Sequence, residues 1–303
     1  MAGIFDDLRR TFKQGNIVQR LIFINGVAFV VGMLLSVVLG LFGMNVGTLL
    51  RDYLYLPADL LQLLRRPWTV ITYMFLHSGI WHLLGNMLWL YWFGQMFLYF
   101  FSSKHLRGLY ILGGLMGGLF YVLAYNVFPV FEGQLYSATL VGASASVLAV
   151  AIATAVREPE YRINLMLVGP VKLKYFALVI VLFDLLSVGS NNAGGHLAHL
   201  GGALTGWWFA SSIAKGHDIT RWVNACIDAL GSVWSGKPRQ PRPRRKPKMK
   251  VHVNTGRAAD YDYNARKKAQ SDDIDTILEK LKRSGYSSLS EEEKRKLFEA
   301  SKR

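Results

Sequence analysis

Long apolar runs fill the first two thirds of the chain, and a charged stretch follows them. A helix needs about 20 mostly apolar residues to cross the hydrocarbon core of a membrane. By this criterion the sequence predicts six spans, at residues 21–42, 82–101, 106–127, 138–155, 175–188 and 196–213. The fifth run is short unless residues 165–171 extend it. The pattern therefore predicts an all-α fold, a polytopic membrane bundle of six transmembrane helices over residues 17–215.

The segments outside the bundle are polar. Residues 1–16 are predicted to be a short cytoplasmic segment, and residues 216–269 a cytoplasmic linker whose part 237–250 is rich in proline, lysine and arginine. Such a composition is typical of an extended chain. Residues 270–303 are predicted to form a small helical hairpin, because apolar residues recur at helical spacing and Ser290 and Glu293 form a capping box.

Composition supports a membrane protein. Hydrophobic residues make up 51% of the chain and charged residues only 18%, whereas soluble proteins have about 25% charged residues. Cys226 is the sole cysteine of the sequence, which excludes an intrachain disulfide and a cysteine-based zinc site. The net charge of +15 could suggest nucleic acid, but no basic recognition motif accompanies it. Membrane lipids are the better-supported partner, and no nucleic-acid partner is predicted.

The distribution of Lys and Arg predicts the orientation of the bundle. The N-terminal segment and the loops at 102–107 and 156–174 are basic, whereas the loops at 128–137 and 189–195 contain neither residue. Short basic loops mark the cytoplasmic side. Both termini are therefore predicted to be cytoplasmic, in the bacterial inner membrane. The second, fourth and sixth spans then run from outside to inside.

Four polar side chains lie near the outer ends of these three spans, where burial in lipid makes them costly. They are His82 and Asn86, Ser144, and His199. A histidine within hydrogen-bond reach can take the proton of a serine, and an amide with a second imidazole can stabilise an oxyanion. The set therefore predicts acyl-transfer chemistry at one shallow depth.

Each of these polar residues also has a structural interpretation. Ser144 alone could bond its own helix, and His77 and His196 are expected to be interfacial. A zinc site built from the histidines lacks an H-E-x-x-H motif or clustered carboxylates, so no metal or cofactor is predicted. Asp184 is the one acid well inside a span and could support a helix contact or orient a group. Without a further member of a triad, a Ser–His dyad is the economical prediction.

The motifs around these residues resemble those of the rhomboid intramembrane serine proteases. His82-Leu-Leu-Gly-Asn86 is similar to the family's H-x-x-x-N, Gly142-Ala-Ser-Ala to its G-x-S-G, and Ala198-His-Leu-Gly-Gly-Ala-Leu-Thr-Gly206 to its A-H-x-x-G-x-x-x-G. The resemblance implies that Ser144 is the nucleophile and His199 the general base, with His82 and Asn86 stabilising the oxyanion. Ala145 replaces a family glycine, and Thr69 replaces the arginine that often follows the tryptophan at position 68.

The resemblance implies an intramembrane serine endopeptidase that cleaves transmembrane segments of membrane proteins near the outer interface. The alternative is a catalytically inactive rhomboid-like protein that binds client transmembrane helices. A channel or transporter is disfavoured, because the sequence has neither repeated halves nor broken charged helices. The substrate and the oligomeric state are left open.

Overall fold

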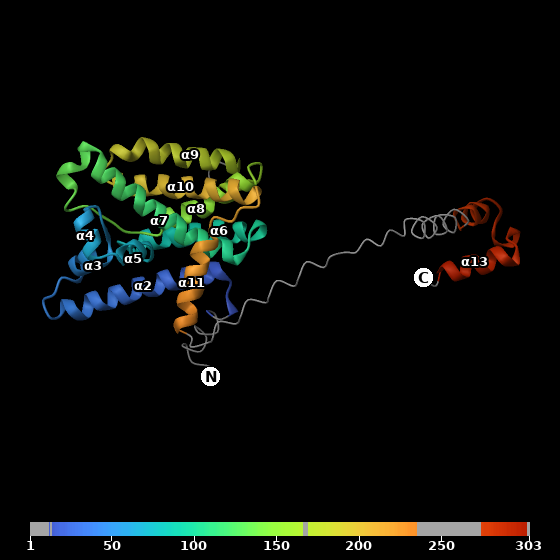
Figure 1. Cartoon of the computed structure of the whole chain (residues 1–303), viewed down its shortest axis with the longest axis horizontal. Helices are drawn as coiled ribbons and strands as arrows, with labels where there is room; N and C mark the ends of the chain where they lie inside the picture. Colours follow the sequence, from blue (N-terminus) through green and yellow to red (C-terminus); the bar gives the residue numbers. More distant parts are fainter. Residues whose placement is uncertain (1–11, 13, 166–168, 235–273, 302–303) are drawn as a thin grey trace, which may run out of the picture. The chain divides into compact units, whose positions relative to one another are not determined.

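The fold is described from a computed structural model, which describes residues 12, 14–165, 169–234 and 274–301. The chain divides into two compact units, Met1–Pro238 and Arg239–Arg303, and each is described by itself. Helices dominate the described residues of each unit (Figure 1). The longer helices of the first unit are α2 (Ile17–Gly40), α6 (Ile80–Phe100), α7 (Ser103–Val127), α8 (Ser144–Arg157), α9 (Leu173–Leu186), α10 (Ala193–Ala214) and α11 (Arg221–Trp234).

Short elements connect these helices. Between α2 and α6 lie α3 (Val46–Leu54), β1 (Leu56–Pro57), α4 (Leu60–Arg65), α5 (Thr69–Thr72) and the 3-10 turn η1 (Tyr73–Phe75). Later come η2 (Pro129–Gln134), β2 (Thr139–Leu140), the hairpin strands β3 (Arg162–Leu165) and β4 (Gly169–Lys172), and η3 (Ser187–Gly189). Strand β1 pairs antiparallel with β2, and β3 pairs antiparallel with β4.

Helix α8 lies at the centre of the first unit, between α7 and α10, because small residues let the backbones approach. A Cβ atom added to Gly202 of α10 would lie 2.2 Å from the carbonyl oxygen of Ala145. On the other side, a Cβ atom added to Gly117 of α7 would lie 2.5 Å from the Ala145 side chain. Such small-residue contacts are how helices pack in lipid. The position of Ala145 against Gly117 also shows how the protein accommodates an alanine where the family has glycine.

The structure moves the start of the fourth predicted span and does not show the extension considered for the fifth. The fourth was predicted from residue 138, but 139–140 pair with β1 and Gly142 adopts a φ of +130°, so α8 begins only at Ser144. A positive φ interrupts helix geometry at a position that glycine tolerates. Residues 165 and 169–171 do not lengthen the fifth span, because strands β3 (162–165) and β4 (169–172) pair antiparallel before α9.

The prediction that residues 216–269 are a linker is wrong for its first part. Helix α11 forms there and packs on α7, where Gly108 leaves room for Thr220 and Asn224. Arg107 of α7 donates hydrogen bonds to Asn224 at 2.9 Å and to Asp228 at 2.8 Å. These polar contacts and the space beside Gly108 hold α11 against α7. The polar composition of this segment did not predict a packed helix. The proline-rich part at 237–250 lies outside the described residues.

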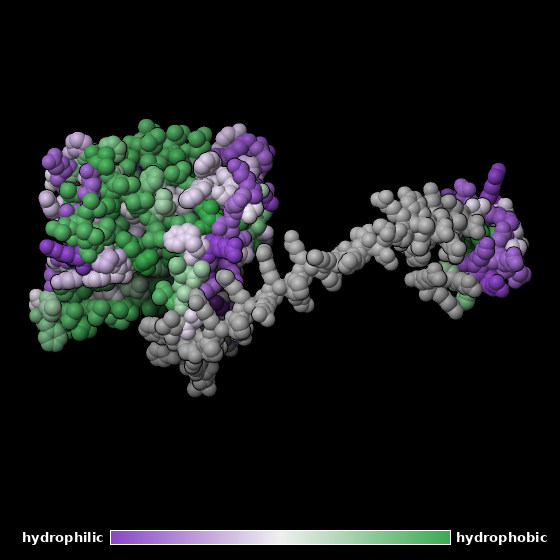
Figure 2. Space-filling view, viewed as in Figure 1, coloured by the Kyte–Doolittle hydropathy of each residue, from purple (hydrophilic) through white to green (hydrophobic). Residues whose placement is uncertain are grey.

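The outer surface of the first unit is strongly apolar. Helices α2 and α7 are long and apolar enough to cross a membrane, and only 11% of the apolar window of α2 is buried. Figure 2 shows hydrophobic residues across the middle of the visible face and hydrophilic ones towards the helix ends. In water such a band would be costly, whereas lipid covers it without penalty. The six-span count agrees with this arrangement and stays a prediction.

The second unit contains the predicted helical hairpin. Residues 274–284 are helical, η4 (Tyr286–Ser288) follows Gly285, which has a φ of +77°, and α13 spans Glu291–Ser301. The capping box at the start of α13 is confirmed. Ser290 N–H donates to the Glu293 carboxylate at 2.7 Å, and Glu293 N–H donates to Ser290 Oγ at 3.3 Å.

Candidate active site

Ser144 is the first residue of α8. The backbone N–H groups of the first helical turn precede the first intrahelical bond, which Val147 N–H donates to the Ala143 carbonyl at 2.9 Å. Free N–H groups and the helix dipole make such a position favourable for a negative charge. Gly142, which precedes the helix, has no side chain, and this lets the His82 ring lie against the start of α8. A Cβ atom at Gly142 would lie only 2.8 Å from His82 Nε2. The serine hydroxyl, the N–H groups and an imidazole therefore converge at one point.

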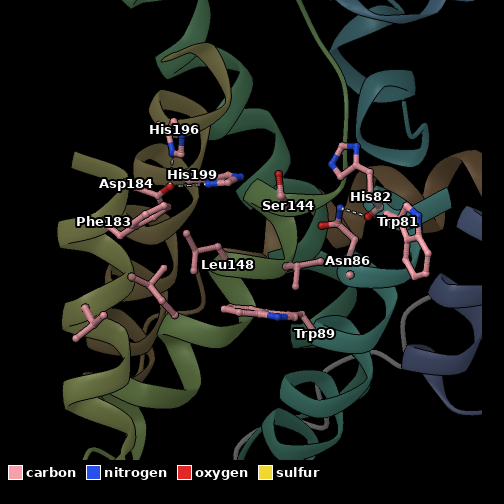
Figure 3. A pocket seen from close by; sticks show the side chains of 14 residues that line it. Trp81, His82, Asn86, Trp89, Ser144, Leu148, Phe183, Asp184, His196 and His199 are labelled. Atoms are coloured by element: carbon pink, nitrogen blue, oxygen red, sulfur yellow. Dashed lines mark hydrogen bonds and ion pairs between the residues drawn. The ribbon is translucent and has the colours of Figure 1, made fainter. Parts of the chain in front are cut away.

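His199, on α10, is oriented by a carboxylate from α9. Its Nδ1 bonds Asp184 Oδ1 at 2.8 Å, and the Asp184 side chain is 4% exposed. A carboxylate only accepts hydrogen bonds, so this contact keeps the proton on Nδ1 and leaves Nε2 free as a base. Figure 3 shows the ring of His199 between Asp184 and Ser144. In space the imidazole therefore lies between a carboxylate and a hydroxyl, which is the order of the groups in a Ser-His-Asp triad.

His82 and Asn86 lie on α6, across the cavity from His199 (Figure 3). Ser78 Oγ lies 3.1 Å from His82 Nδ1. When the serine hydroxyl donates this bond, the proton of the neutral ring is on Nε2, beside Gly142. Asn86 Nδ2 donates one bond to its own helix, to the His82 carbonyl at 2.9 Å, and has a second N–H to offer. Both side chains can therefore act as donors near Ser144.

Two adjoining cavities meet at these residues. A mainly apolar cavity of about 500 Å³ lies between α6 and α9, and a more polar one of about 600 Å³ lies towards β2 and the start of α10. Both are lined by all four residues predicted from the sequence, His82, Asn86, Ser144 and His199. The four candidate residues thus lie where the apolar cavity meets the polar one.

Comparison with known proteins identifies the family. The family model described as the Rhomboid domain matches residues 64–215, which is half of the chain. This chain belongs to the rhomboid family. The relationship predicted from the three motifs is confirmed, and the protein is a membrane protein. A second model, described as a family of unknown function, matches residues 258–303.

A curated relative of this rhomboid protein is the "RHOMBOID-like protein 12, mitochondrial" of Arabidopsis thaliana. The two are 29% identical over 158 residues, which cover 49% of this chain and 47% of the relative. The chain thus aligns with about half the length of that protein.

Several sequence interpretations change in the rhomboid fold. Asp184, which the sequence suggested could support a helix contact or orient a group, bonds both His196 and His199. The sequence pointed to this residue, because it is a single acid inside an apolar span. It did not show which side chains the acid bonds. His77, expected to be interfacial, is only 7% exposed, and its ring centroid lies 5.1 Å from that of His82. Burial lowers the pKa of His77 to about 4, so its ring is neutral at pH 7.

Ser146 is the second serine near the start of α8, and it lies on another face. It is fully buried, and a Cβ atom added to Gly114 of α7 would lie 2.7 Å from its hydroxyl oxygen. Two residues along a helix correspond to a rotation of about 200°. Ser146 therefore faces α7, whereas Ser144 lines the two cavities.

Proposed function

We propose that this rhomboid protein is an intramembrane serine endopeptidase that cleaves transmembrane segments of membrane proteins near the outer interface. The observation that carries the proposal is the arrangement of Ser144, His199 and Asp184 at the meeting point of an apolar and a polar cavity. Ser144 is the nucleophile and His199 the general base. Asp184 is a positioning residue that holds the tautomer and the orientation of His199.

The first half of the reaction acylates the enzyme. Ser144 Oγ attacks the scissile carbonyl carbon while His199 Nε2 takes the serine proton. The developing oxyanion receives hydrogen bonds from the first-turn N–H groups of α8 and from His82 and Asn86. The tetrahedral intermediate collapses, His199 donates its proton to the leaving amine, and the C–N bond breaks. The acyl group stays on Ser144 as an ester.

The second half consumes water. A water molecule from the polar cavity gives its proton to His199 and attacks the ester carbonyl, and the same donors hold the second oxyanion. His199 then returns the proton to Ser144 Oγ, and the carboxylate product leaves. The polar cavity, which includes Gln134 and Asn191, supports this route for water.

The apolar cavity supports lateral entry of the substrate between α6 and α9. Its walls include Trp89 from α6 and Val179 from α9. An intact substrate helix hides its carbonyl groups in internal hydrogen bonds, so a cleavable segment has to unwind next to Ser144. Small or helix-breaking residues near the outer end of the substrate are therefore expected to favour cleavage.

We also propose six spans, with both termini in the cytoplasm of a bacterial cell and the protein in its inner membrane. The polar site residues lie near the first residues of α6, α8 and α10. The basic loops follow the ends of α6 and α8. This separation supports the orientation drawn from the positive charges.

The decisive experiment is cleavage of a single-span substrate by the full-length protein in detergent. Ser144→Ala and His199→Ala are expected to lower the cleavage rate by more than about 10³-fold, because each removes a participant in bond making. Ser146→Ala is the matched control, expected to retain cleavage. A fluorophosphonate probe should label the wild-type protein and the Ser146→Ala variant, but not Ser144→Ala.

The same experiment tests the competing function. A wild-type chain that folds, retains a client helix on copurification and neither cleaves it nor reacts with the probe would be an inactive rhomboid-like binding protein. Cleavage that survives Ser144→Ala and disappears with Ser146→Ala would contradict the assignment of the nucleophile.

A further inference from the structure

One carboxylate oxygen beside the candidate active site is in hydrogen-bond contact with two imidazole rings. Asp184 Oδ1 lies 2.7 Å from His196 Nδ1 and 2.8 Å from His199 Nδ1, and Figure 3 shows both rings against this carboxylate. The proposed reaction uses the contact with His199 and has no role for His196. Residues 196 and 199 are three apart on α10, which puts them on one face of the helix.

Two neutral imidazoles and a carboxylate are also a ligand set for a transition-metal ion. Each of the three residues offers one ligand atom, a ring nitrogen or a carboxylate oxygen, that lies within 4.8 Å of the other two. Ligand atoms of a tetrahedral zinc site with bonds of about 2.1 Å are about 3.4 Å apart, so shifts of about 1.4 Å or less would bring the three ligand atoms into place. The three side chains lie on the wall of the cavity between α6 and α9, which gives an ion a route to them.

We propose that Asp184, His196 and His199 form an inhibitory site for a borderline divalent cation, Zn²⁺ in particular. The proposal rests on the proposed protease function, because it makes the general base itself a metal ligand. Three protein ligands leave the remaining coordination position of the ion to water. Nitrogen and carboxylate ligands without thiolates suit Zn²⁺ better than Mg²⁺ or Ca²⁺, which prefer oxygen ligands.

Inhibition follows from the tautomer of His199. In the metal-free protein the ring carries its proton on Nδ1, and Nε2 has the free electron pair that accepts the serine proton. When Nδ1 binds the ion, its proton leaves and Nε2 takes one up, so the ring stays neutral but presents an N–H to Ser144. A ring in that state cannot act as the general base. Loss of a general base costs on the order of 10²- to 10⁴-fold in rate.

The binding test uses the metal alone and does not depend on activity. Full-length protein without a histidine tag is dialysed in detergent against Zn²⁺, and the bound metal is measured per chain. Co²⁺ serves as a coloured substitute, because four-coordinate sites give it visible absorption. We expect one tight ion per wild-type chain and none for His196→Gln or His196→Asn. His217→Gln is the matched control, because His217 is an exposed histidine after the end of α10, and it should retain the ion.

The inhibition test compares each variant with its own metal-free rate. Saturating Zn²⁺ is expected to slow cleavage by the wild type and by His217→Gln by on the order of 10²-fold, with full recovery after chelation. His196→Gln is expected to lose most of this sensitivity. The pair of readouts separates the inhibitory site from general damage to the active site.

Several results would overturn the inference. A wild-type chain that binds no Zn²⁺ contradicts it whether or not the variants fold, as does a His196→Gln variant that keeps the ion. Bound Zn²⁺ with an unchanged cleavage rate, or cleavage that stops on chelation, contradicts inhibition. Stoichiometric binding by a chain that cleaves nothing would retain the metal site and reject the protease function, so the two failures can be told apart.

Discussion

Helices α8 and α9 are both 14 residues long and mostly apolar, yet they occupy opposite environments. Eleven residues of α8 are buried, and in α9 only Leu173 and Asp184 are. Alanines and other small residues let α8 contact its neighbours closely on all sides, whereas the large side chains of α9, such as Phe183 and Leu186, point outwards. Equal length and apolarity therefore say little about where a helix lies in this protein.

The difference assigns different mechanical roles to the two helices. Ser144, the proposed nucleophile, is carried by α8, whose close packing holds it in place. On α9, Asp184 bonds the two histidines of α10, and Phe176 packs on Trp89 and Phe93 of α6 with ring centroids 5.6 and 5.4 Å apart. The expectation is that changes around α8 disturb folding, whereas changes in α9 disturb the orientation of the base and the entry of substrate.

Among the changes that compare α8 with α9, the largest effect is expected where α10 contacts α8. In Gly202→Ala the new methyl group would overlap the Ala145 backbone, and overpacking of this kind costs up to about 3 kcal/mol. Thermal unfolding in detergent and cleavage should both show the loss. Gly26→Ala in α2 is the control, because an added Cβ atom there meets nothing within 4 Å. Equal stability of the two variants would contradict the view that close packing of α8 against α10 stabilises the protein.

A smaller effect, on rate rather than folding, is expected from Asp184→Asn. The amide can donate to Nδ1 of His199, which favours the wrong tautomer of the base. The turnover number should fall on the order of 10²-fold or more, in the same direction as the roughly 10⁴-fold loss that this change causes in a Ser-His-Asp triad. The pH dependence of cleavage should change as well. Asp228→Asn, which removes the negative charge from the contact with Arg107, is the control.

If α9 merely packs and the carboxylate does not orient the base, Asp184→Asn would alter the melting temperature while the turnover number and its pH profile stayed the same. That result would remove Asp184 from the proposed mechanism without affecting the roles of Ser144 and His199.

Next in size is Phe176→Ala, which removes the aromatic contacts between α9 and α6. Such contacts are worth about 0.5–1.5 kcal/mol per pair beyond simple burial. Cleavage of a helical substrate is expected to rise a few-fold, because the route between the helices opens more readily. The measurement is the rate of cleavage with a single-span substrate. Phe128→Ala, at an exposed position after α7, is the control, and an equal change in both variants would argue against entry at α9.

The smallest effect is expected in the hairpin before α9. Lys172, 2.7 Å away, and Lys174 hold the pKa of Glu160 down at about 2 through hydrogen bonds. Because the folded pKa is depressed, the stabilisation is present above pH 4.5 and disappears as the pH falls from 4.5 to 2. Glu160→Gln should lower the melting temperature by about 2 °C or less at pH 7, since the group is exposed. A difference that persists at pH 2 would show that the charge is not its cause.

The family and the four candidate site residues could be predicted because the signals for them lie in short stretches of the sequence. Apolar runs of membrane length, one Ser and two His near the span starts, and glycines at helix-contact spacing are all features of the linear chain. The capping box at Ser290 was equally local. Each of these signals lies within a few residues, so no knowledge of distant neighbours was needed.

Other features depend on contacts between segments far apart in the sequence. The late start of α8 follows from the pairing of β2 with β1, some 80 residues earlier, and the position of α11 depends on the space beside Gly108. Above all, an acid in α9 became the partner of two histidines in α10 only when the helices packed together. The sequence alone determined which reactive groups this protein possesses. The tertiary structure decided which of them touch, because hydrogen bonds and close packing act over a few ångströms in space, whatever the separation along the chain.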